Sequence, residues 1–399
     1  MAAEQRSLTR DSSPGSAGGS PADDTMILLE NGPDGRPALF QNPLAMIRAD
    51  AAPGVDAALA ALDAARAAGH WLAGYASYEL GLALEPRLVP LMPENRELPL
   101  MQFGVFDGPA PADTLLDRAA SESAGAALSP ARPGWTAAEH GAALARILDY
   151  IAAGDIYQAN LTMPMRARAT GSALGLYGAL RARQPVSHGA FVHWPGTPAI
   201  LSRSPELFFA IDASGRIETR PMKGTAPRAS NPAHDAALKM GLQQSVKDRA
   251  ENLMIVDLLR NDISRICRPG SVRVPQLYAI ESYATVHQMV SHVTGVLMPN
   301  TPPSAIFRAL FPCGSITGAP KIRAMEIIRA LEPDPRGIYC GAIGWLAPDG
   351  AAAFNVAIRT ITLAGQSASF GVGGGIVIDS TAEGEYEEAL WKARFASLT

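Results

Sequence analysis

The stretch SPELFFAIDASGRIETRPMKG, residues 204–224, predicts a β-hairpin. Residues 207–211 form an apolar first arm, and residues 212–215 after it are typical of a tight turn. Facing positions should have residue numbers that sum to roughly 427–429, depending on the length of the loop. Glu206 and Lys223 are therefore expected nearly opposite each other at the open end of the hairpin. Such a pair is either a structural salt bridge or a general acid/base beside a lysine whose pKa can be lowered for nucleophilic attack.

The segments on both sides of the hairpin mix helical and strand patterns without a regular βαβ alternation. Thr136 and Glu139 form a capping box that predicts the start of a helix, and Gly154 is its expected end. Further helices are predicted over 245–262, 320–331 and 381–397, strands over 71–77 and 156–165, and a second hairpin turn at 348–350. We therefore expect an α+β fold with antiparallel sheets.

Composition divides the chain into three parts. Residues 1–25 are rich in Ser, Gly, Pro and Asp and cannot bury enough apolar surface to offset their ordering entropy, which predicts a disordered tail. An N-terminal region follows over 26–133. Its last part, from about residue 108, is rich in Ala, Pro and Ser and is expected to be a loop or a boundary. Residues 134–399 form the main domain.

The bulk composition argues against several classes of protein. A formal net charge of −4 disfavours broad binding to nucleic acid or to an anionic membrane. The sequence shows neither an apolar run of membrane-spanning length nor a signal-peptide core. Its three cysteines, Cys267, Cys313 and Cys340, form no CxxC pair, which suits reduced thiols better than disulfides or a zinc site. We therefore expect a cytoplasmic protein without nucleic-acid or membrane partners.

Two stretches of the sequence resemble nucleotide-binding motifs but do not match them. The run GVGGGI, residues 371–376, has Ile376 where a dinucleotide fingerprint needs Gly or Ala, and residues 376–378 favour a strand over a helix. The run GSITGAPK, residues 314–321, has the wrong spacing for a P-loop. The dehydrogenase and ATPase interpretations therefore lose their support.

Two predicted helices carry carboxylates on one face. Asp248 and Glu251 are three residues apart after the expected N-cap Ser245, and Glu385, Glu388 and Lys392 form a second stripe. Such stripes are often only solvated faces with ordinary ion pairs. The first helix, however, continues into the apolar run 253–259, so its carboxylates lie near the core and need a compensating cation. Oxygen ligands of this kind suit Mg²⁺ that shares oxygens with an anionic substrate.

Glycine-rich loops near basic residues form a further group. They cover residues 313–321, 341–344 and 371–375, and Arg359 is expected in a strand over 354–360. Each glycine could serve only a tight turn. Alternatively, backbone N–H groups together with Arg359 and Lys392 could bind carboxylates.

Eight strings resemble the chorismate-utilising family in their order and content. They are GDIYQANL (154–161), SPELF (204–208), PMKGT (221–225), DRAENLMIVDLLRND (248–262), FPCGSITGAPK (311–321), YCGAIG (339–344), AIRT (357–360) and GGGIVIDS (373–380). The resemblance implies two large antiparallel β-sheets packed as a sandwich and flanked by helices, with the site between them. It makes 134–399 a chorismate-binding catalytic domain and 26–133 a contributor to the sandwich, and it implies chorismate or isochorismate as substrate with one Mg²⁺. The N-terminal third keeps only short family-like pieces.

The resemblance also implies a role for individual residues. Glu251 and Glu388 match metal-binding glutamates, with Asp248 and Glu385 in support. The matches for the groups that hold the two substrate carboxylates are Arg359, Lys392, Gly373, Gly374 and Gly375. Tyr339 matches a pyruvyl-side contact, and His287 and Thr317 match positions near the ring and its C4 hydroxyl. For His287, the pattern of an apolar strand by itself favours a plain core residue.

Two positions separate the branches of the family. Relatives that add water at C2 have a lysine where this chain has Gln158, so water addition is disfavoured. Lys223 resembles the lysine of the branch that transfers ammonia to C4 of chorismate and forms 4-amino-4-deoxychorismate on the way to p-aminobenzoate and folate. The resemblance implies that Lys223 attacks C2 while Glu206 acts as acid and base.

One further expectation follows from this interpretation, and two alternatives to it stay open. Ammonia should come from a separate glutamine amidotransferase subunit, because none of the three cysteines lies in a glutaminase-like context. One alternative is an anthranilate synthase, in which ammonia adds at C2 and pyruvate is lost. The other is an inactive relative with a binding or regulatory role.

Overall fold

The predicted hairpin is present and has the predicted register. Strand β12 (Leu207–Ile211) pairs antiparallel with β13 (Arg216–Thr219), with Ala210 opposite Glu218 and Ile211 opposite Ile217. Asp212 Oδ1 accepts hydrogen bonds from the backbone N–H groups of Ser214 and Arg216 and closes the turn. The short side chain of an aspartate bonds the backbone ahead of it without strain, which explains why this sequence turns here.

The pairing does not extend to Glu206 and Lys223, so they are not cross-strand partners. Lys223 lies on β14 (Met222–Pro227), which pairs with β16 (Val286–Val296) and not with β12. Pro221 precedes β14 and has no N–H to donate to a ladder, and the β14–β16 register shifts between Met222 and Thr225. The chain therefore leaves the hairpin just before Lys223.

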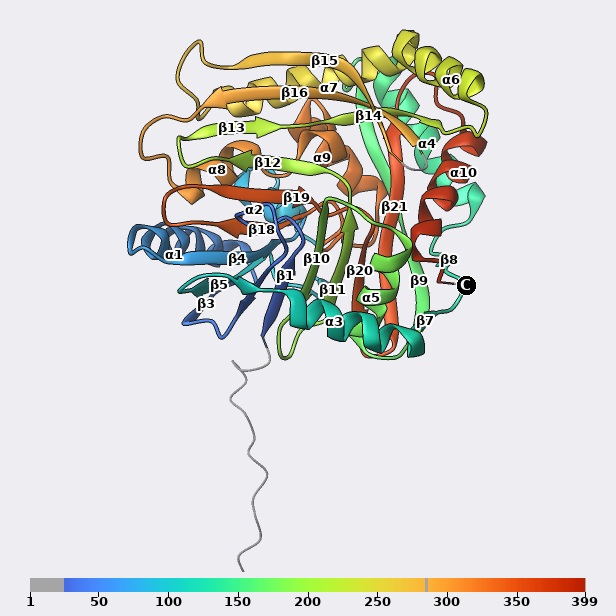
Figure 1. The fold of residues 1–399 in the computed structure, drawn as a ribbon. Coiled ribbons are helices and arrows are strands. Elements are labelled where there is room, and N and C mark those ends of the chain that lie inside the picture. The colour runs from blue at the N-terminus through green and yellow to red at the C-terminus, as the bar shows by residue number, and fades with distance from the viewer. Residues whose placement is uncertain (1–24, 284–285, 399) are drawn as a thin grey trace, which may run out of the picture.

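The computed structural model describes residues 25–283 and 286–398 (Figure 1). In this part of the chain, all strand pairs are antiparallel and build two large sheets whose strands cross steeply in Figure 1. The first sheet has the order β17 (Gly318–Ala319), β9 (Gln158–Thr170), β21 (Ser367–Ile376), β20 (Thr360–Ala364), β11 (Ala199–Ser204), β10 (His188–His193), β1 (Met26–Leu29), β2 (Ala38–Gln41) and β6 (Ala110–Pro111), and β7 (Ala127–Leu128) and β8 (Arg132–Pro133) also pair with β9. The second has the order β14, β16, β13, β12, β19 (Ala352–Val356), β18 (Ala342–Leu346), β4 (Trp71–Ala76), β5 (Met101–Phe106) and β3 (Ala45–Ala49), and β15 (Arg273–Ser282) also pairs with β16.

Three apolar clusters hold the layers together. One joins the inner faces of the two sheets, and residues such as Ile27, Tyr75 and Ile343 belong to it. A second packs α1 (Val55–Ala67), α2 (Leu80–Leu84), α7 (Val246–Ser264) and α8 (Pro303–Leu310) on the outside of the second sheet. A third packs α3 (Asp113–Glu122), α4 (Ala137–Ala152), α5 (Ala173–Arg183), α9 (Lys321–Leu331) and α10 (Ala382–Lys392) against the first sheet. The expected α+β sandwich flanked by helices is confirmed.

The helices predicted over 245–262, 320–331 and 381–397 are confirmed as α7, α9, and α10 with the short 3₁₀ segment Ala393–Ala396. The capping box is also confirmed: Thr136 Oγ1 accepts from the Glu139 N–H, and the Glu139 carboxylate accepts from the Thr136 N–H. The strand expected at 156–165 is longer and forms β9. Helix α6 (Pro232–Gln244) precedes α7.

Three local predictions are corrected. Residues 108–133 are not a plain loop, because they contain α3, whose Leu115 and Ala119 are buried against α5. Arg359 is not inside a strand: it lies in the connection that carries the chain from β19 in the second sheet to β20 in the first. The strand expected over 376–378 ends at Ile376.

The N-terminal region shares both sheets with the rest of the chain. Strands β1, β2 and β6 extend the first sheet, and β3, β4 and β5 extend the second. The tail predicted for residues 1–25 lies outside the described residues except for Thr25. None of the helices described here combines the length and the apolar character that crossing a bilayer would require.

Candidate active site

The predicted site residues converge where β14, the end of β21 and the first turns of α7 and α10 meet, near the upper end of β21 in Figure 1. Gly224 follows Lys223 with φ +84°, and a Cβ there would lie 2.9 Å from Asp248 Oδ1. Only glycine adopts this conformation without strain and leaves the space, so β14 can pack closely on α7. Ser245 Oγ accepts from the Asp248 N–H and caps α7 as predicted.

The glycines of β21 allow side chains to approach the strand from both faces. A Cβ on Gly375 would overlap Gln158 Nε2 and lie 3.4 Å from Lys223 Nζ. A Cβ on Gly374 would point to the other face, 3.1 Å from Glu385 Oε2 and 3.4 Å from Lys392 Nζ. The glycine-rich loop expected over 371–375 is therefore wrong: these residues belong to strand β21, whose glycines leave room for polar side chains.

Glu206 is a buried carboxylic acid with one close hydrogen-bond donor. Its side chain is 6% exposed, and Oε1 accepts from Ser315 Oγ at 2.8 Å. Burial raises the pKa of Glu206, although Ser315, Lys223 and Arg359 oppose the shift. A raised pKa keeps a carboxyl group protonated and able to donate a proton.

The pKa of Lys223 is shifted in the opposite direction. Burial lowers the pKa of Lys223, although Glu206 and Glu251 oppose the shift. Among the described residues, Lys223 forms no ion pair. An amine that loses water without gaining a close carboxylate is more easily deprotonated, and the free amine is the nucleophilic form.

The predicted metal-binding carboxylates lie close to one another but differ in their surroundings. Burial raises the pKa of Glu251. Lys223 and Lys247 oppose this shift, and the charges of Asp248 and Glu385 add to it to a smaller extent. Glu388 forms an ion pair with Lys392 at 2.7 Å; although its burial acts to raise the pKa, Lys392 outweighs that effect and the pKa is lowered. Glu385 Oε1 accepts from Ser380 Oγ at 2.6 Å.

No group of three or more His, Cys, Asp or Glu in the described part of the chain converges tightly enough to form a complete metal site by itself. The donors are nevertheless all carboxylate oxygens, and Asp248 and Glu385 add negative charge beside Glu251. Mg²⁺ commonly takes one or two protein carboxylates and completes its shell with water and substrate oxygens. The residues therefore fit Mg²⁺ that binds together with an anionic ligand.

Two basic groups approach the same cluster. Lys392 Nζ donates to the Gly373 carbonyl at 2.8 Å in addition to its ion pair with Glu388. Arg359 has φ +49° at the connection between the sheets, a conformation that costs energy for a residue with a Cβ. The positive charge of Arg359 acts to lower the pKa of Glu206, which indicates that the guanidinium lies near the site.

The remaining predicted contacts already have partners within the protein. Tyr339 lies against Gly371, because a Cβ there would overlap its ring. The buried Thr317 hydroxyl donates to the carbonyls of Cys313 or Gly314. Both ring nitrogens of His287 are occupied, by Ser282 Oγ at 2.8 Å and Asp235 Oδ1 at 3.1 Å. His287 therefore has the bonding of a satisfied core histidine.

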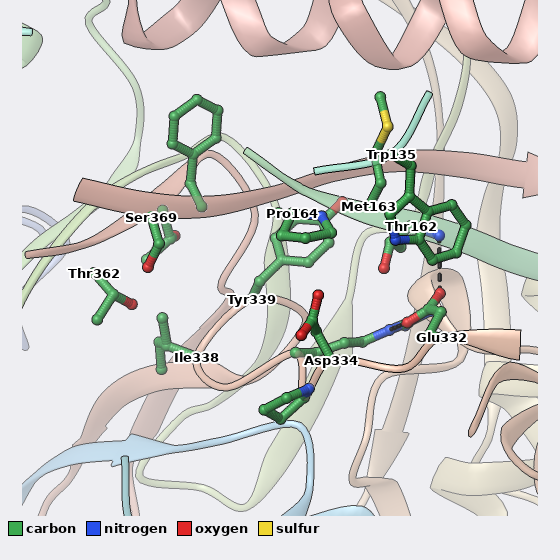
Figure 2. Close-up of a pocket in the computed structure, with 15 residues that line it drawn as sticks. Trp135, Thr162, Met163, Pro164, Glu332, Asp334, Ile338, Tyr339, Thr362 and Ser369 are labelled. Carbon is green, nitrogen blue, oxygen red and sulfur yellow. Dashed lines mark hydrogen bonds and ion pairs between the residues drawn. The ribbon is translucent and has the colours of Figure 1, made fainter. Parts of the chain in front are cut away.

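A pocket lined by both apolar and polar residues includes Tyr339. Figure 2 shows Tyr339, Thr362, Ser369 and Asp334 around it, with the Glu332 carboxylate bonded to the Thr162 N–H at 2.8 Å. Lys223, Glu206 and the four predicted metal carboxylates do not line this pocket.

Sequence reasoning missed Ser315 and underrated Gln158. Ser315 lies within the quoted string FPCGSITGAPK, but only its contact with Glu206, 109 residues away, gives it a role. For Gln158, the sequence predicts only that it cannot activate water. The structure places its amide beside Lys223.

Comparisons with known proteins indicate the family of this chain. The family model described as chorismate binding enzyme matches residues 24–397. An aminodeoxychorismate synthase of Streptomyces pristinaespiralis is 47% identical over 241 residues, which are 60% of this chain and 33% of that protein. Aminodeoxychorismate synthase component 1 of Escherichia coli (strain K12) is 44% identical over 257 residues, or 64% of this chain and 56% of that protein.

The chain thus matches between a third and just over half of the length of these curated relatives. Among solved structures, anthranilate synthase component I from Streptococcus pneumoniae TIGR4 superposes with a TM-score of 0.73 at 26% identity, covering 98% of this chain and 94% of that one. Because the family model spans nearly the whole described chain, this protein belongs to the chorismate binding enzyme family.

Proposed function

We propose that this chain converts chorismate and ammonia into 4-amino-4-deoxychorismate and water, with Lys223 as the nucleophile. One arrangement carries the proposal: the Lys223 amine, without an ion-pair partner among the described residues, lies in the same cluster as the buried Glu206 carboxyl group. Burial favours the neutral form of both, a free amine and a protonated acid, which are the forms that an addition with loss of a hydroxyl group requires. The aminodeoxychorismate synthases among the relatives support the same reaction.

In the first half of the reaction, Lys223 Nζ forms a bond to C2 of the ring. The ring double bonds shift, the C4–O bond breaks, and Glu206 gives its proton to the departing hydroxyl, which leaves as water. In the second half, ammonia forms a bond to C4, the double bonds shift back, and the C2–Nζ bond breaks with its electron pair returning to lysine. The proton lost by the new amino group restores Glu206. Two displacements replace one difficult substitution.

The other residues of the cluster serve to bind the substrate. Arg359, Lys392 and the backbone of Gly373–Gly375 are suited to the two carboxylates, because each offers N–H donors or positive charge. Glu251 and Glu388, with Asp248 and Glu385 nearby, would hold Mg²⁺. Bound there, the ion would screen these carboxylates from those of the substrate.

The solved relative supports a second candidate, anthranilate formation, in which ammonia adds at C2 and pyruvate leaves. The two reactions give different products. If the purified chain with Mg²⁺, chorismate and ammonium is coupled to a separate lyase, we expect p-aminobenzoate. Fluorescent o-aminobenzoate formed without the lyase would establish the second candidate instead.

The lysine's role is tested by Lys223→Ala, with the exposed Lys239→Ala on α6 as the control. We expect Lys223→Ala to lose at least about a hundredfold in turnover, in the range for loss of a positioned catalytic group, while it keeps its unfolding midpoint. Mass spectrometry of the wild-type chain with chorismate but no ammonia should detect a substrate adduct on Lys223. Near-normal turnover by Lys223→Ala would exclude covalent catalysis.

A further inference from the structure

The loop over residues 311–320 carries Ser315, the hydrogen-bond donor to Glu206. It joins α8, which ends at Leu310, to α9, which begins at Lys321. Ser315 is buried, and its Oγ lies 2.8 Å from Glu206 Oε1. A hydroxyl that moves away by about 1 Å no longer forms such a bond. The bond to Glu206 therefore depends on where the backbone of this loop lies.

Lys321 spans the two ends of the loop. Its Nζ donates to the Leu310 carbonyl at 3.0 Å and to Asp262 Oδ2 at 2.6 Å. Leu310 is the last residue of α8, where a carbonyl lacks a partner within the helix and a cation is favoured. Asp262 lies in the last turn of α7. One ammonium group thus ties the start and the end of the loop to α7.

The ion pair of Lys321 and Asp262 is buried. The two side chains are 15% and 5% exposed, respectively. Burial raises the pKa of Asp262, and the charge of Lys321 opposes that shift. Removing both charges from water costs about as much as their attraction returns, so a buried pair adds little stability compared with an apolar one. It can nevertheless fix the relative position of the elements that it joins.

Lys321 reaches Glu206 only through the loop. The groups that surround the Glu206 carboxyl in the described chain are one donor, two cations and two thiols: Ser315, Lys223, Arg359, Cys313 and Cys340. Burial raises the pKa of both thiols to about 12, so they stay neutral near neutral pH. The charges of Lys321 and Asp262 are not among those that shift the pKa of Glu206.

We propose that Lys321 is a positioning residue for Glu206; this rests on the proposed function, in which Glu206 is the acid. By holding Asp262 and the end of α8, Lys321 fixes the loop at the place where Ser315 donates to that acid. The ammonium group is occupied by its two acceptors and takes no part in proton transfer. The lysine that ends GSITGAPK thereby acquires a role, which is not that of a P-loop lysine.

The test removes the ion pair as a unit, by Lys321→Met together with Asp262→Leu. This double variant keeps the net charge and should keep an unfolding midpoint close to that of the wild type. Lys321→Met alone should unfold more easily, because it leaves the charge of Asp262 buried and unpaired. The measurement is the pH profile of adduct formation at Lys223 without ammonia. The alkaline limb, where Glu206 loses its proton, should move up by about 0.5–1 pH unit in the double variant, the shift that one lost hydrogen bond produces.

Combination with Ser315→Ala distinguishes positioning from a general loosening of the fold. Ser315→Ala alone should move the alkaline limb in the same direction. Added to the double variant, it should cause no further shift, because the bond is already lost, whereas independent effects would add. Asp262→Asn keeps the shape of the side chain and one acceptor for Lys321, so it should cause a smaller shift. This milder variant decides the question alone if the double variant does not fold.

The control is Arg308→Gln together with Asp56→Asn, which removes the exposed ion pair between α8 and α1. It should leave the pH profile unchanged. An alkaline limb at the wild-type position in the double variant and in Asp262→Asn, or a shift that adds to that of Ser315→Ala, would overturn the proposal. A wild-type chain that forms no adduct at Lys223 would instead refute the proposed function, and with it this role.

Discussion

At Lys223 and Glu206, burial pushes two pKa values in opposite directions. Loss of water disfavours the charged form of each group, so the pKa of the amine falls and that of the acid rises. The attraction between them opposes both shifts, and at close range it would restore the ion pair. Lys223 forms no ion pair among the described residues, so burial remains the larger influence on both pKa values.

The first prediction concerns Ser315, whose hydrogen bond to Glu206 acts to lower the pKa of that acid. Adduct formation at Lys223 should decline at low pH, where the amine is protonated, and at high pH, where Glu206 loses its proton. Ser315→Ala should raise the pKa of Glu206 further and move the alkaline limb of the adduct-formation rate to higher pH. The rate is measured without ammonia, by stopped mixing and mass spectrometry.

The exposed turn variant Ser214→Ala provides the comparison for Ser315→Ala. Its pH profile should match that of the wild type. An alkaline limb that moves to lower pH in Ser315→Ala would contradict the assignment of Glu206 as the acid.

The second prediction concerns the carboxylates on α7 and α10. Glu251→Gln and Glu388→Gln should each raise the Mg²⁺ concentration needed for half-maximal turnover by about tenfold or more, because an amide is a weaker ligand than a carboxylate. Glu387→Gln, the exposed neighbour on α10, should not. The measurement is a Mg²⁺ titration of metal-stripped protein. Full activity in excess chelator would exclude the metal from the reaction.

At the scale of elements, the site depends on close packing that glycine makes possible. Gly224 allows β14 to approach α7, and Gly374 and Gly375 allow side chains to approach β21 from both faces. The same principle governs helices α3 and α5 on the outside of the first sheet. A Cβ on Gly178 of α5 would lie 2.6 Å from the Ala119 carbonyl carbon in α3.

Gly178→Ala is therefore expected to destabilise the protein. Alanine favours a helix over glycine by about 1 kcal/mol, but overpacking against α3 costs about 1–3 kcal/mol, so the unfolding midpoint should fall. Gly241→Ala on α6 is the matched variant, because no atom lies within 4 Å of the added Cβ. It should stabilise the protein by about 0.5–1 kcal/mol. Thermal unfolding of both variants makes the comparison, and a stabilised Gly178→Ala would mean that α3 does not pack there.

At the scale of the whole molecule, each of the two sheets contributes different residues to the proposed site. The second sheet contributes Lys223 through β14, and the first contributes the glycines of β21 and the Gln158 amide of β9. Arg359 lies on the connection that passes between them. Any shift of one sheet relative to the other would separate the proposed nucleophile, Lys223, from the glycines of β21 that are proposed to bind the substrate.

The last prediction concerns the source of ammonia. Because ammonium has no lone pair, this chain alone should use ammonium salts increasingly well as the pH rises toward the pKa of ammonia, within the range that Lys223 and Glu206 allow. Glutamine should support turnover only when a glutamine amidotransferase subunit is added. The measurement is product formation from each nitrogen source with and without that subunit. Glutamine-dependent turnover by the rigorously purified 399-residue chain would contradict the partner assignment.

The sequence by itself determined the local structure and the family. The capping box of Thr136 and Glu139, the register of the hairpin at 212–215 and the helix that Ser245 caps all depend on residues a few positions apart. Such contacts are encoded by spacing, so they can be predicted without the fold. The order of the quoted strings likewise sufficed to recognise the chorismate binding enzymes.

Only the tertiary structure decided which residues meet. Helix α3 escaped prediction because its narrow apolar face is defined by α5, not by its own composition. Ser315 donates a hydrogen bond to Glu206, and the Gln158 amide lies near Lys223. Both contacts join parts of the chain that are far apart in sequence. These contacts exist because the two sheets stack and the glycines of β21 leave space between them. Long-range packing of this kind leaves no periodic signal in a sequence, since each side chain's environment is set by other elements.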